Sequence, residues 1–111
     1  MISLIIPTYR NPEYLDICLK SAVEGQTLNN EIIVVVDGFV EESNEILEKY
    51  KGKIQVLPLE DNQGMQQALN LGVMNATNER IMIINDDNVL SKGWDITIKE
   101  NLKKGEVLTI N

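Results

Sequence analysis

The chain has 111 residues, of which 17 are Asp or Glu and 10 are Lys or Arg, so its net charge is −7. This length favours one domain with one hydrophobic core, and the acidic balance argues against a nucleic acid or an anionic membrane as a partner held by charge. The absence of histidine excludes serine–histidine and cysteine–histidine catalysis, and the single cysteine, Cys18, excludes an internal disulfide and favours a reducing, cytoplasmic location.

The first half of the chain alternates between strand and helix patterns. Residues 2–6 are apolar and predict a short strand. Asn11 and Pro12 are typical of a helix start, and apolar side chains follow them at helical spacing, with Cys18 among the expected core residues. Residues 32–36 are all β-branched, which favours a strand inside a parallel sheet that helices cover on both faces. This is the longest apolar run and is far shorter than the roughly 20 residues of a membrane span. A second helix is predicted at residues 42–50.

The second half of the chain repeats this alternation. Residues 54–58 predict a strand, and a helix begins near Gly64. A fourth strand is predicted at residues 80–84, and a fourth helix contains Trp94, which we expect in the core. Residues 106–110 predict a fifth strand. Five alternating units predict one α/β domain over residues 1–111, in which a mostly parallel, Rossmann-like sheet carries helices on both faces.

Polar segments follow the first four predicted strands. Ligands of such sheets bind beyond the carboxyl ends of the strands. The segments at these ends are, in chain order, Pro7-Thr8-Tyr9-Arg10-Asn11, Asp37-Gly38, Glu60-Asp61-Asn62-Gln63-Gly64 and Asn85-Asp86-Asp87-Asn88. The loops at the opposite end, residues 25–30 and 75–79, contain no adjacent carboxylates. We therefore expect the four polar segments to form one shared site.

Asp86 and Asp87 are the most informative pair in these segments. Carboxylates and amides without histidine or cysteine are oxygen ligands that suit Mg²⁺ or Mn²⁺ better than zinc. The alternative interpretation is that both acids are solvated loop residues or cap the following helix.

Four other parts of the expected site also have two interpretations. Asn62 and Gly64 indicate either a turn with a helix cap or a helix start whose free amides face an anion. Asp37 is either a turn residue or an acceptor for a ring N–H of a base. Tyr9 either packs on the rim or offers a flat face beside a base. Arg10 is either a rim cation or the partner of a nearby acid.

Taken in order, the segments SLIIPTY, EIIVVVDG, NQGMQQALNLGVMNAT and RIMIINDDNVLSKGW resemble the nucleotide-sugar-binding half of family 2 glycosyltransferases, which have the GT-A fold. The resemblance extends from about residue 2 to residue 102. Its most specific part is the pattern N-x-G-x-x-x-A-x-N-x-G, matched here by Asn62, Gly64, Ala68, Asn70 and Gly72. The chain departs from the family pattern at Arg10, where asparagine is common, at Val36, where a first Asp is common, and at Phe39, where serine is common.

The resemblance implies a role for each matched residue. The first loop and Asp37 would hold a uracil or thymine base, and residues 85–87 occupy the place of the D-x-D motif, in its N-x-D form. Asp87 would bind Mn²⁺ or Mg²⁺, which would reverse the local charge and carry the diphosphate of a UDP- or dTDP-linked sugar. The implied nucleotide-binding residues are Pro7, Thr8, Tyr9, Arg10, Asp37, Asn62, Gly64, Asn70, Asn85 and Asp86.

No residue matches the catalytic aspartate of the family, which belongs to an acceptor-binding half beyond position 111. Glu41, Glu42, Asp95 and Glu100 are interpreted as solvated acids or first-turn caps of helices. We therefore expect a donor-binding domain of an inverting glycosyltransferase with no catalytic base of its own. The glycan or lipid-linked acceptor is not identified by the sequence. Two other classes stay open, a non-catalytic nucleotide-sugar-binding module and a structural domain with a degenerate site.

Overall fold

Strands and helices alternate along the chain in the predicted order. The structure, a computed structural model, describes residues 1–110. Its elements are β1 (Ile2–Thr8), α1 (Pro12–Gly25), β2 (Glu31–Asp37), the 3₁₀ helix η1 (Val40–Ser43), α2 (Asn44–Glu48), β3 (Gln55–Leu59), α3 (Met65–Asn75), β4 (Arg80–Ile83), α4 (Trp94–Asn101) and β5 (Val107–Thr109). Each strand lies within two residues of its predicted bounds.

The strands form one parallel sheet in the order β3-β2-β1-β4-β5. The central strand is β1, which pairs with β2 on one side and with β4 on the other. The chain moves outward from β1 through β2 to β3 and then crosses to the far side of β1. This reversal is a topological switch point, where open α/β sheets bind ligands. The predicted Rossmann-like fold class is confirmed.

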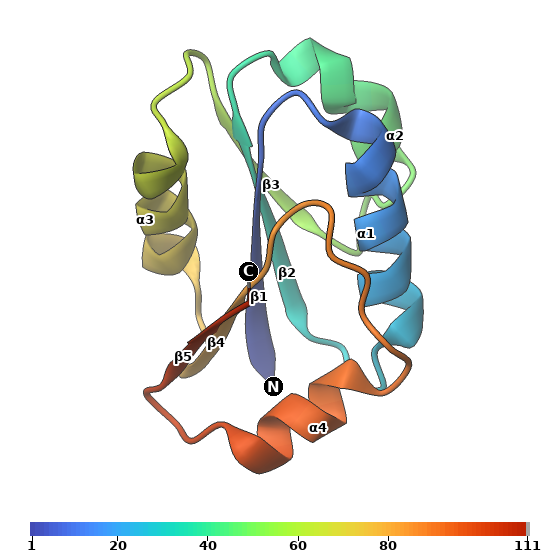
Figure 1. Ribbon diagram of the computed structural model, residues 1–111, viewed down its shortest axis with the longest axis vertical. Coiled ribbons are helices and arrows are strands. Elements are labelled where there is room, and N and C mark those ends of the chain that lie inside the picture. Colours follow the sequence, from blue (N-terminus) through green and yellow to red (C-terminus); the bar gives the residue numbers. More distant parts are fainter. Residues whose placement is uncertain (111) are drawn as a thin grey trace.

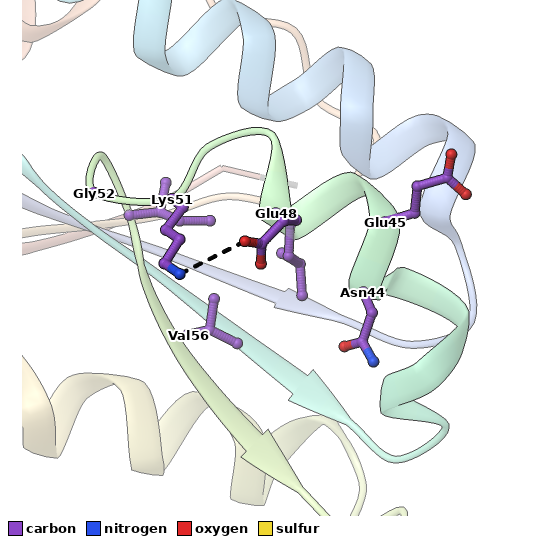
Figure 2. Close-up of a pocket in the computed structure, with 8 residues that line it drawn as sticks. Asn44, Glu45, Glu48, Lys51, Gly52 and Val56 are labelled. Carbon is purple, nitrogen blue, oxygen red and sulfur yellow. Dashed lines mark ion pairs between the residues drawn. The ribbon is translucent and has the colours of Figure 1, made fainter.

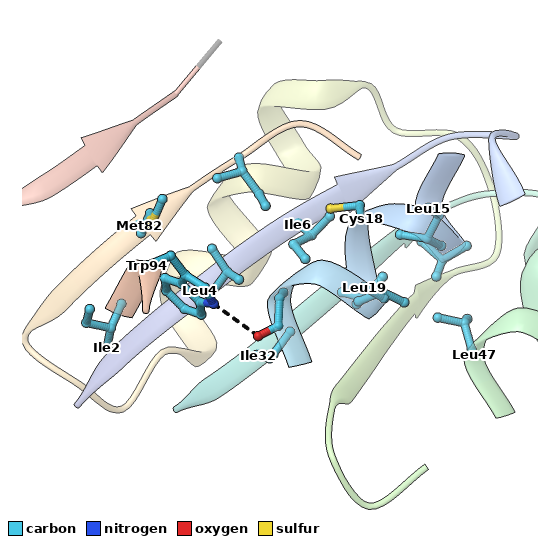
Figure 3. Close-up of a cluster of buried hydrophobic side chains, with 14 residues drawn as sticks. Ile2, Leu4, Ile6, Leu15, Cys18, Leu19, Ile32, Leu47, Met82 and Trp94 are labelled. Carbon is cyan, nitrogen blue, oxygen red and sulfur yellow. Dashed lines mark hydrogen bonds between the residues drawn. The ribbon is translucent and has the colours of Figure 1, made fainter. Parts of the chain in front are cut away.

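Helices cover both faces of the sheet, as Figure 1 shows. Helix α3 covers one face of the sheet, and α1 and α2 cover the other. Helix α4 lies at the bottom of the view, and its Trp94 packs in the same core cluster as α1. The larger core cluster joins alternate residues of the strands to α1, α2 and α4 (Figure 3), and the smaller cluster joins the opposite face of the sheet to α3. Trp94 is 5% exposed, and its indole N–H donates to the carbonyl oxygen of Ala22 at 3.0 Å. The core positions predicted for Trp94 and Cys18 are therefore confirmed.

Glycine at position 72 allows helix α3 to pack directly against side chains of the sheet. A Cβ atom at Gly72 would lie 2.4 Å from Cγ2 of Ile5 and 3.2 Å from Cγ2 of Val35. Contacts below 3 Å require the neighbouring atoms to move, and Ile5 is fully buried. The last glycine of the N-x-G-x-x-x-A-x-N-x-G pattern therefore serves packing.

Three local predictions need correction. The predicted helix at residues 42–50 begins as η1 at Val40, and its α-helical part ends at Glu48. Asn11 stands at the N-cap position of α1 without capping it, because its side-chain amide donates to Asp86 instead. Asp95 lies in the first turn of α4 but is fully buried, because it accepts hydrogen bonds from the loop between α1 and β2.

None of the helices in residues 1–110 is both long enough and apolar enough to cross a membrane.

Candidate functional site

The loops that follow β1, β2 and β3 lie together at one end of the sheet, the upper end in Figure 1. The loop after β4 is joined to them by side-chain hydrogen bonds. We call this end of the sheet the carboxyl rim. Parallel pairing places all of these strand ends on the same side, so the four polar segments of the sequence converge, as predicted.

Asp86 ties the loop after β4 to the loop after β1. Its Oδ2 accepts a hydrogen bond of 2.7 Å from the hydroxyl of Thr8, and its Oδ1 accepts one of 3.2 Å from the side-chain amide of Asn11. Thr8 is fully buried, and Asp86 is partly buried. Both oxygens of this carboxylate are thus bonded to protein groups, which fixes the loop relative to the sheet.

Asp87 is exposed and directly follows this fixed residue. The turn that carries it is closed by Asn88, whose side-chain oxygen accepts from the N–H of Asn85 at 2.7 Å and whose N–H donates to the carbonyl of Asn85 at 3.2 Å. Within residues 1–110, neither Asp86 nor Asp87 forms an ion pair with Lys or Arg. Two adjacent carboxylates therefore stand at the rim without a cationic partner.

The carboxylates of the rim suit a cation that takes few protein ligands. The described residues contain no group of three or more Asp, Glu, Cys or His side chains able to hold a metal ion together. Mg²⁺ fits such a place because it keeps several waters and binds through one or two carboxylates and the oxygens of a phosphate ligand. A zinc site would require several nitrogen or sulfur ligands, and the sequence contains no histidine.

The negative field of the rim reaches the core below it. Burial, followed by the charges of Asp86 and Asp87, raises the pKa of the Cys18 thiol to about 12. The Cys18 sulfur lies 3.7 Å from the carbonyl oxygen of Asn85, so the thiol is a donor under the rim. Cys18 is therefore a protonated core residue at neutral pH and not a nucleophile.

Asp37 connects the end of β2 to the start of α3. It is 2% exposed, and its two oxygens accept hydrogen bonds from the backbone N–H groups of Gln63 at 2.7 Å and Gly64 at 3.1 Å. The amides at this helix start thus face an anion, and the anion is Asp37 itself. Gly38 allows the close approach, because its φ is +82° and a Cβ atom there would lie 2.9 Å from the nitrogen of Asn62.

A cluster at the ends of β1 and β2 joins Tyr9, Arg10, Phe39 and Glu42. The guanidinium of Arg10 pairs with Glu42 through Nε at 3.2 Å and through a terminal nitrogen at 3.1 Å. This ion pair is one of the two interpretations that the sequence allows for Arg10, and the nucleotide-binding role of Arg10 stays a prediction. The hydrogen bond and charge of Glu42 raise the pKa of Arg10. Phe39 was not among the predicted site residues. Its only signal in the sequence was an aromatic residue where the family pattern has serine.

Within the described part of the chain, two predicted nucleotide-binding residues, Pro7 and Asn70, have side chains that form no hydrogen bond with the other residues of the carboxyl rim. Pro7 is buried within β1, where it pairs with Val35. Asn70 lies in the second turn of α3, is exposed, and accepts a hydrogen bond of 3.3 Å from Gln66 one turn earlier. No hydrogen bond in the described residues joins Asn70 to the rim, so its nucleotide-binding role stays a prediction.

A separate hollow of about 580 Å³ lies between α2 and β3 (Figure 2). Leu47, Ile54 and Val56 form its apolar part, and an ion pair of 3.7 Å joins Glu48 to Lys51 at its edge. None of the predicted nucleotide- or metal-binding residues lines it. The hollow is therefore distinct from the carboxyl rim.

A parallel α/β sheet with helices on both faces and a polar switch point defines the doubly wound α/β class, whose members bind ligands at that point. The family follows from comparison with known proteins. Residues 3–110 match the protein family described as glycosyl transferase family 2, and the chain belongs to this family.

Two curated relatives illustrate the match. The chain is 29% identical to the glycosyltransferase GlyG of Streptococcus pneumoniae over 107 residues, which are 94% of this chain and 36% of that protein. It is 28% identical to the poly-beta-1,6-N-acetyl-D-glucosamine synthase of Staphylococcus epidermidis over 109 residues, covering 96% of this chain and 26% of that protein. The chain thus spans about a third or less of the relatives it matches.

Solved structures support the same fold. Residues of the S. aureus TarS fragment 1–349, solved in complex with UDP-GlcNAc, superpose on this chain with a TM-score of 0.77 at 28% identity. The superposition covers 90% of this chain and 29% of that fragment. The predicted GT-A fold is therefore confirmed.

Proposed function

We propose that this chain is the donor-binding domain of a glycosyltransferase and binds a nucleotide-diphosphate sugar at the carboxyl rim. The observation that carries the proposal is the contrast between Asp86, whose oxygens are bonded to Thr8 and Asn11, and Asp87, which is exposed beside it. The carboxylate of Asp86 holds the loop in place, and the carboxylate of Asp87 is available to bind a ligand. The complexes of TarS with UDP and UDP-GlcNAc favour a uridine nucleotide as the donor.

The ligand would extend across the ends of three adjacent strands. Asp37 and Tyr9 lie at the ends of β2 and β1, and Asp87 follows β4 on the far side of β1. Neighbouring strands are spaced about 4.8 Å apart, so these ends are separated by roughly 10 Å. A ribose can bridge this span between a base at Asp37 and a diphosphate at Asp87. Asn62 and Asn85 are exposed amides beside the same path.

A divalent metal is part of the proposal. Mn²⁺ or Mg²⁺ held by Asp87 would neutralise the diphosphate and stabilise the nucleotide as a leaving group. Without it, a dianionic ligand would approach a protein of net charge −7 beside two carboxylates that have no cationic partner. Asp86 would orient Asp87 by holding their shared loop.

We further propose that residues 1–111 alone transfer no sugar to an external acceptor. Glu41, Glu42 and Glu100 are exposed, and Asp95 is buried, so none is offered as the general base. A missing general base costs roughly 10² to 10⁴ in rate, and a missing acceptor site removes the larger gain from holding two reactants together. Transfer by an inverting mechanism would require residues outside this chain, and the glycan or lipid-linked acceptor would bind there.

A cytoplasmic location is the last part of the proposal, and it rests on Cys18, which is buried as a free thiol. The competing candidate is a nucleotide-sugar-binding module that takes part in no transfer. It is favoured by the absence of an assigned base among the described residues and shares every donor contact with the leading proposal.

Calorimetric titration with UDP, in Mn²⁺ and again in EDTA, tests the proposal. We expect binding that weakens at least tenfold in EDTA, because the metal carries the diphosphate. Equal affinity in both buffers would contradict the metal, and no binding of UDP or dTDP in either buffer would contradict the donor site. A product assay with UDP- and dTDP-sugars and glycan acceptors tests the rest, because robust transfer by residues 1–111 would show that a base is present.

A further inference from the structure

Arg10 and Phe39 share a backbone conformation that side chains rarely adopt. Each has φ +48°, and in residues 1–110 these are the only non-glycine residues with positive φ. Bulky residues reach this left-handed region only when the surrounding structure compensates for the strain, and such residues cluster at functional sites. Arg10 is the second residue after β1 and Phe39 the second after β2, so the two strained positions lie at the ends of adjacent strands.

The two residues contact one another through their side chains. The central carbon of the Arg10 guanidinium lies 4.1 Å from the centroid of the Phe39 ring. Tyr9 meets the same ring edge to face, with centroids 6.0 Å apart and an interplanar angle of 72°. Glu42 binds the guanidinium through two of its nitrogens. Tyr9, Arg10, Phe39 and Glu42 thus form one unit from two loops, the aromatic corner.

The aromatic corner does not belong to the hydrophobic core. Phe39 is 45% exposed and Tyr9 is 44% exposed, and neither ring packs in the two core clusters. Burying apolar area therefore does not explain why two strained residues hold a phenyl ring at this place. Arg10 covers one face of the ring, and its charge is paired with Glu42, so the guanidinium supports the ring more than it attracts a phosphate.

The corner stands beside the residues of the proposed donor site. Tyr9 directly follows Thr8, which bonds to Asp86, and Phe39 follows Asp37 by two residues. The carboxylates beyond β4 lie on the other side of β1 from this corner. A nucleotide with its diphosphate at Asp87 would therefore bring its base to Tyr9 and Phe39.

We propose that Phe39 stacks on the nucleobase of the bound nucleotide, and that Arg10 and Glu42 are positioning residues that hold the phenyl ring for it. The proposal rests on the proposed function and adds to it a contact made by the ring face, which accepts uracil and thymine alike. Stacking requires no metal, so this part of the affinity is independent of Mn²⁺. The strain at Arg10 and Phe39 is compensated by the ion pair with Glu42 and by the contact between the two side chains.

Replacing Phe39 separates binding from stability. Phe39→Leu keeps an apolar side chain but removes the ring, and Phe39→Asn also removes the strain, because asparagine adopts positive φ more readily. Losing one base–aromatic stack weakens affinity by roughly 5- to 150-fold, and we expect a loss of this size for UDP with both variants. Because Phe39→Asn relieves strain but also loses the contact with Arg10, we expect its melting temperature to lie near that of the parent. Phe39→Tyr keeps the ring face and should bind within about twofold of the parent.

The supporting ion pair is tested by Glu42→Gln. An exposed pair of this kind holds its partners weakly, so we expect UDP affinity to fall by roughly 1.4- to 5-fold. An unchanged affinity would show that the ion pair does not hold the ring, and would overturn the positioning role of Glu42. The matched control is Glu48→Gln, which removes the partner of Lys51 in an exposed pair remote from the rim.

The outcomes distinguish this proposal from the proposed function. The probe is UDP, titrated by calorimetry in Mn²⁺ and in EDTA. If the parent binds no UDP, the donor site itself is wrong. If the parent binds UDP and Phe39→Leu binds it equally well, stacking by Phe39 is overturned and the donor site stands. Parent-like UDP affinity of Phe39→Asn would overturn the stacking in the same way, and the melting temperature of each variant confirms that it is folded during the titration.

Discussion

The hydroxyl of Thr8 donates a hydrogen bond of 2.7 Å to the carboxylate of Asp86, a residue 78 positions further along the chain. This bond joins the end of β1 to the loop after β4, at the point where the order of the strands reverses. It makes Asp86 a structural residue of the rim and leaves Asp87 as the carboxylate that faces outward.

Thr8→Val should destabilise the protein. Valine matches the shape of threonine but removes the hydroxyl, and a hydrogen bond to a charged group contributes roughly 1.5 to 3 kcal/mol. Because Thr8 is fully buried, water does not replace the lost donor. Urea denaturation should show a lower free energy of unfolding for Thr8→Val, whereas the exposed control Thr97→Val should lie within about 0.5 kcal/mol of the parent. An unchanged Thr8→Val protein would show that this bond is not formed in solution.

Asp87→Asn should abolish metal-dependent nucleotide binding without unfolding the protein. The substitution keeps the size of the side chain and removes its charge, and altering the surroundings of a metal ligand already costs about 10- to 100-fold in affinity. We therefore expect UDP affinity in Mn²⁺ to fall by at least about tenfold and to become insensitive to EDTA. Asp61→Asn, which changes an exposed acid of the loop after β3, is the matched control. Full Mn²⁺ dependence in Asp87→Asn would assign the metal to another residue.

Asp37→Ala should reduce both stability and nucleotide affinity. The backbone amides of Gln63 and Gly64 lose their acceptor, which frees the loop before α3. A lost hydrogen bond from a base N–H to the carboxylate would cost roughly 1.5 to 3 kcal/mol, or about 10- to 150-fold in affinity. Calorimetry with UDP at a temperature where the variant is folded measures the second effect alone. Parent-like affinity would limit Asp37 to holding the loop.

Acid should destabilise the protein partly through Asp95. Burial would raise the pKa of this carboxyl, but hydrogen bonds from Leu28, Thr27 and Asn30 outweigh it and hold the pKa below its usual value. A carboxyl whose pKa is lowered by folding stabilises the folded state at every pH above its pKa in the unfolded chain, which is near 4. This contribution disappears as the pH falls through the pKa that the carboxyl has in the folded protein. Urea denaturation between pH 7 and pH 3 should show this loss in the parent. In Asp95→Asn the corresponding part of the pH dependence should be absent, and a parent-like slope would contradict it.

Gly72→Ala should destabilise the protein although alanine favours helices. Helix propensity would gain about 1 kcal/mol, but a Cβ atom 2.4 Å from Ile5 Cγ2 forces the packed core to move, and overpacking costs about 1 to 3 kcal/mol. Thermal denaturation should show a lower melting temperature, while Met74→Ala, at an exposed position of the same helix, should change little. Ile5→Leu removes the clashing methyl group, so the double variant should be more stable than the sum of its single changes predicts.

The sequence by itself determined the elements and the rim. Apolar runs of β-branched residues and helical spacing are local patterns, and they identified all five strands and four helices to within a few residues. Parallel strands separated by helices must end on one side, so the convergence of Thr8, Asp37, Asn62 and Asp86 followed from chain order alone. The family resemblance also assigned the metal to Asp87, and an ion pair was one of two interpretations for Arg10.

Only the tertiary structure decided which side chains form hydrogen bonds within the protein and which remain available to bind a ligand. Asp86 and Asp87 are adjacent residues of the same type, and the difference in their surroundings arises from Thr8 and Asn11, which are more than 70 positions away. Asp95 appeared to be a surface acid for the same reason, because its partners lie 65 or more positions earlier. Hydrogen bonds over such separations depend on how the sheet brings distant loops together, and no local periodicity records them. The contact of Arg10 with Phe39 has the same origin, since β1 and β2 place the two loops side by side only once their strands have paired.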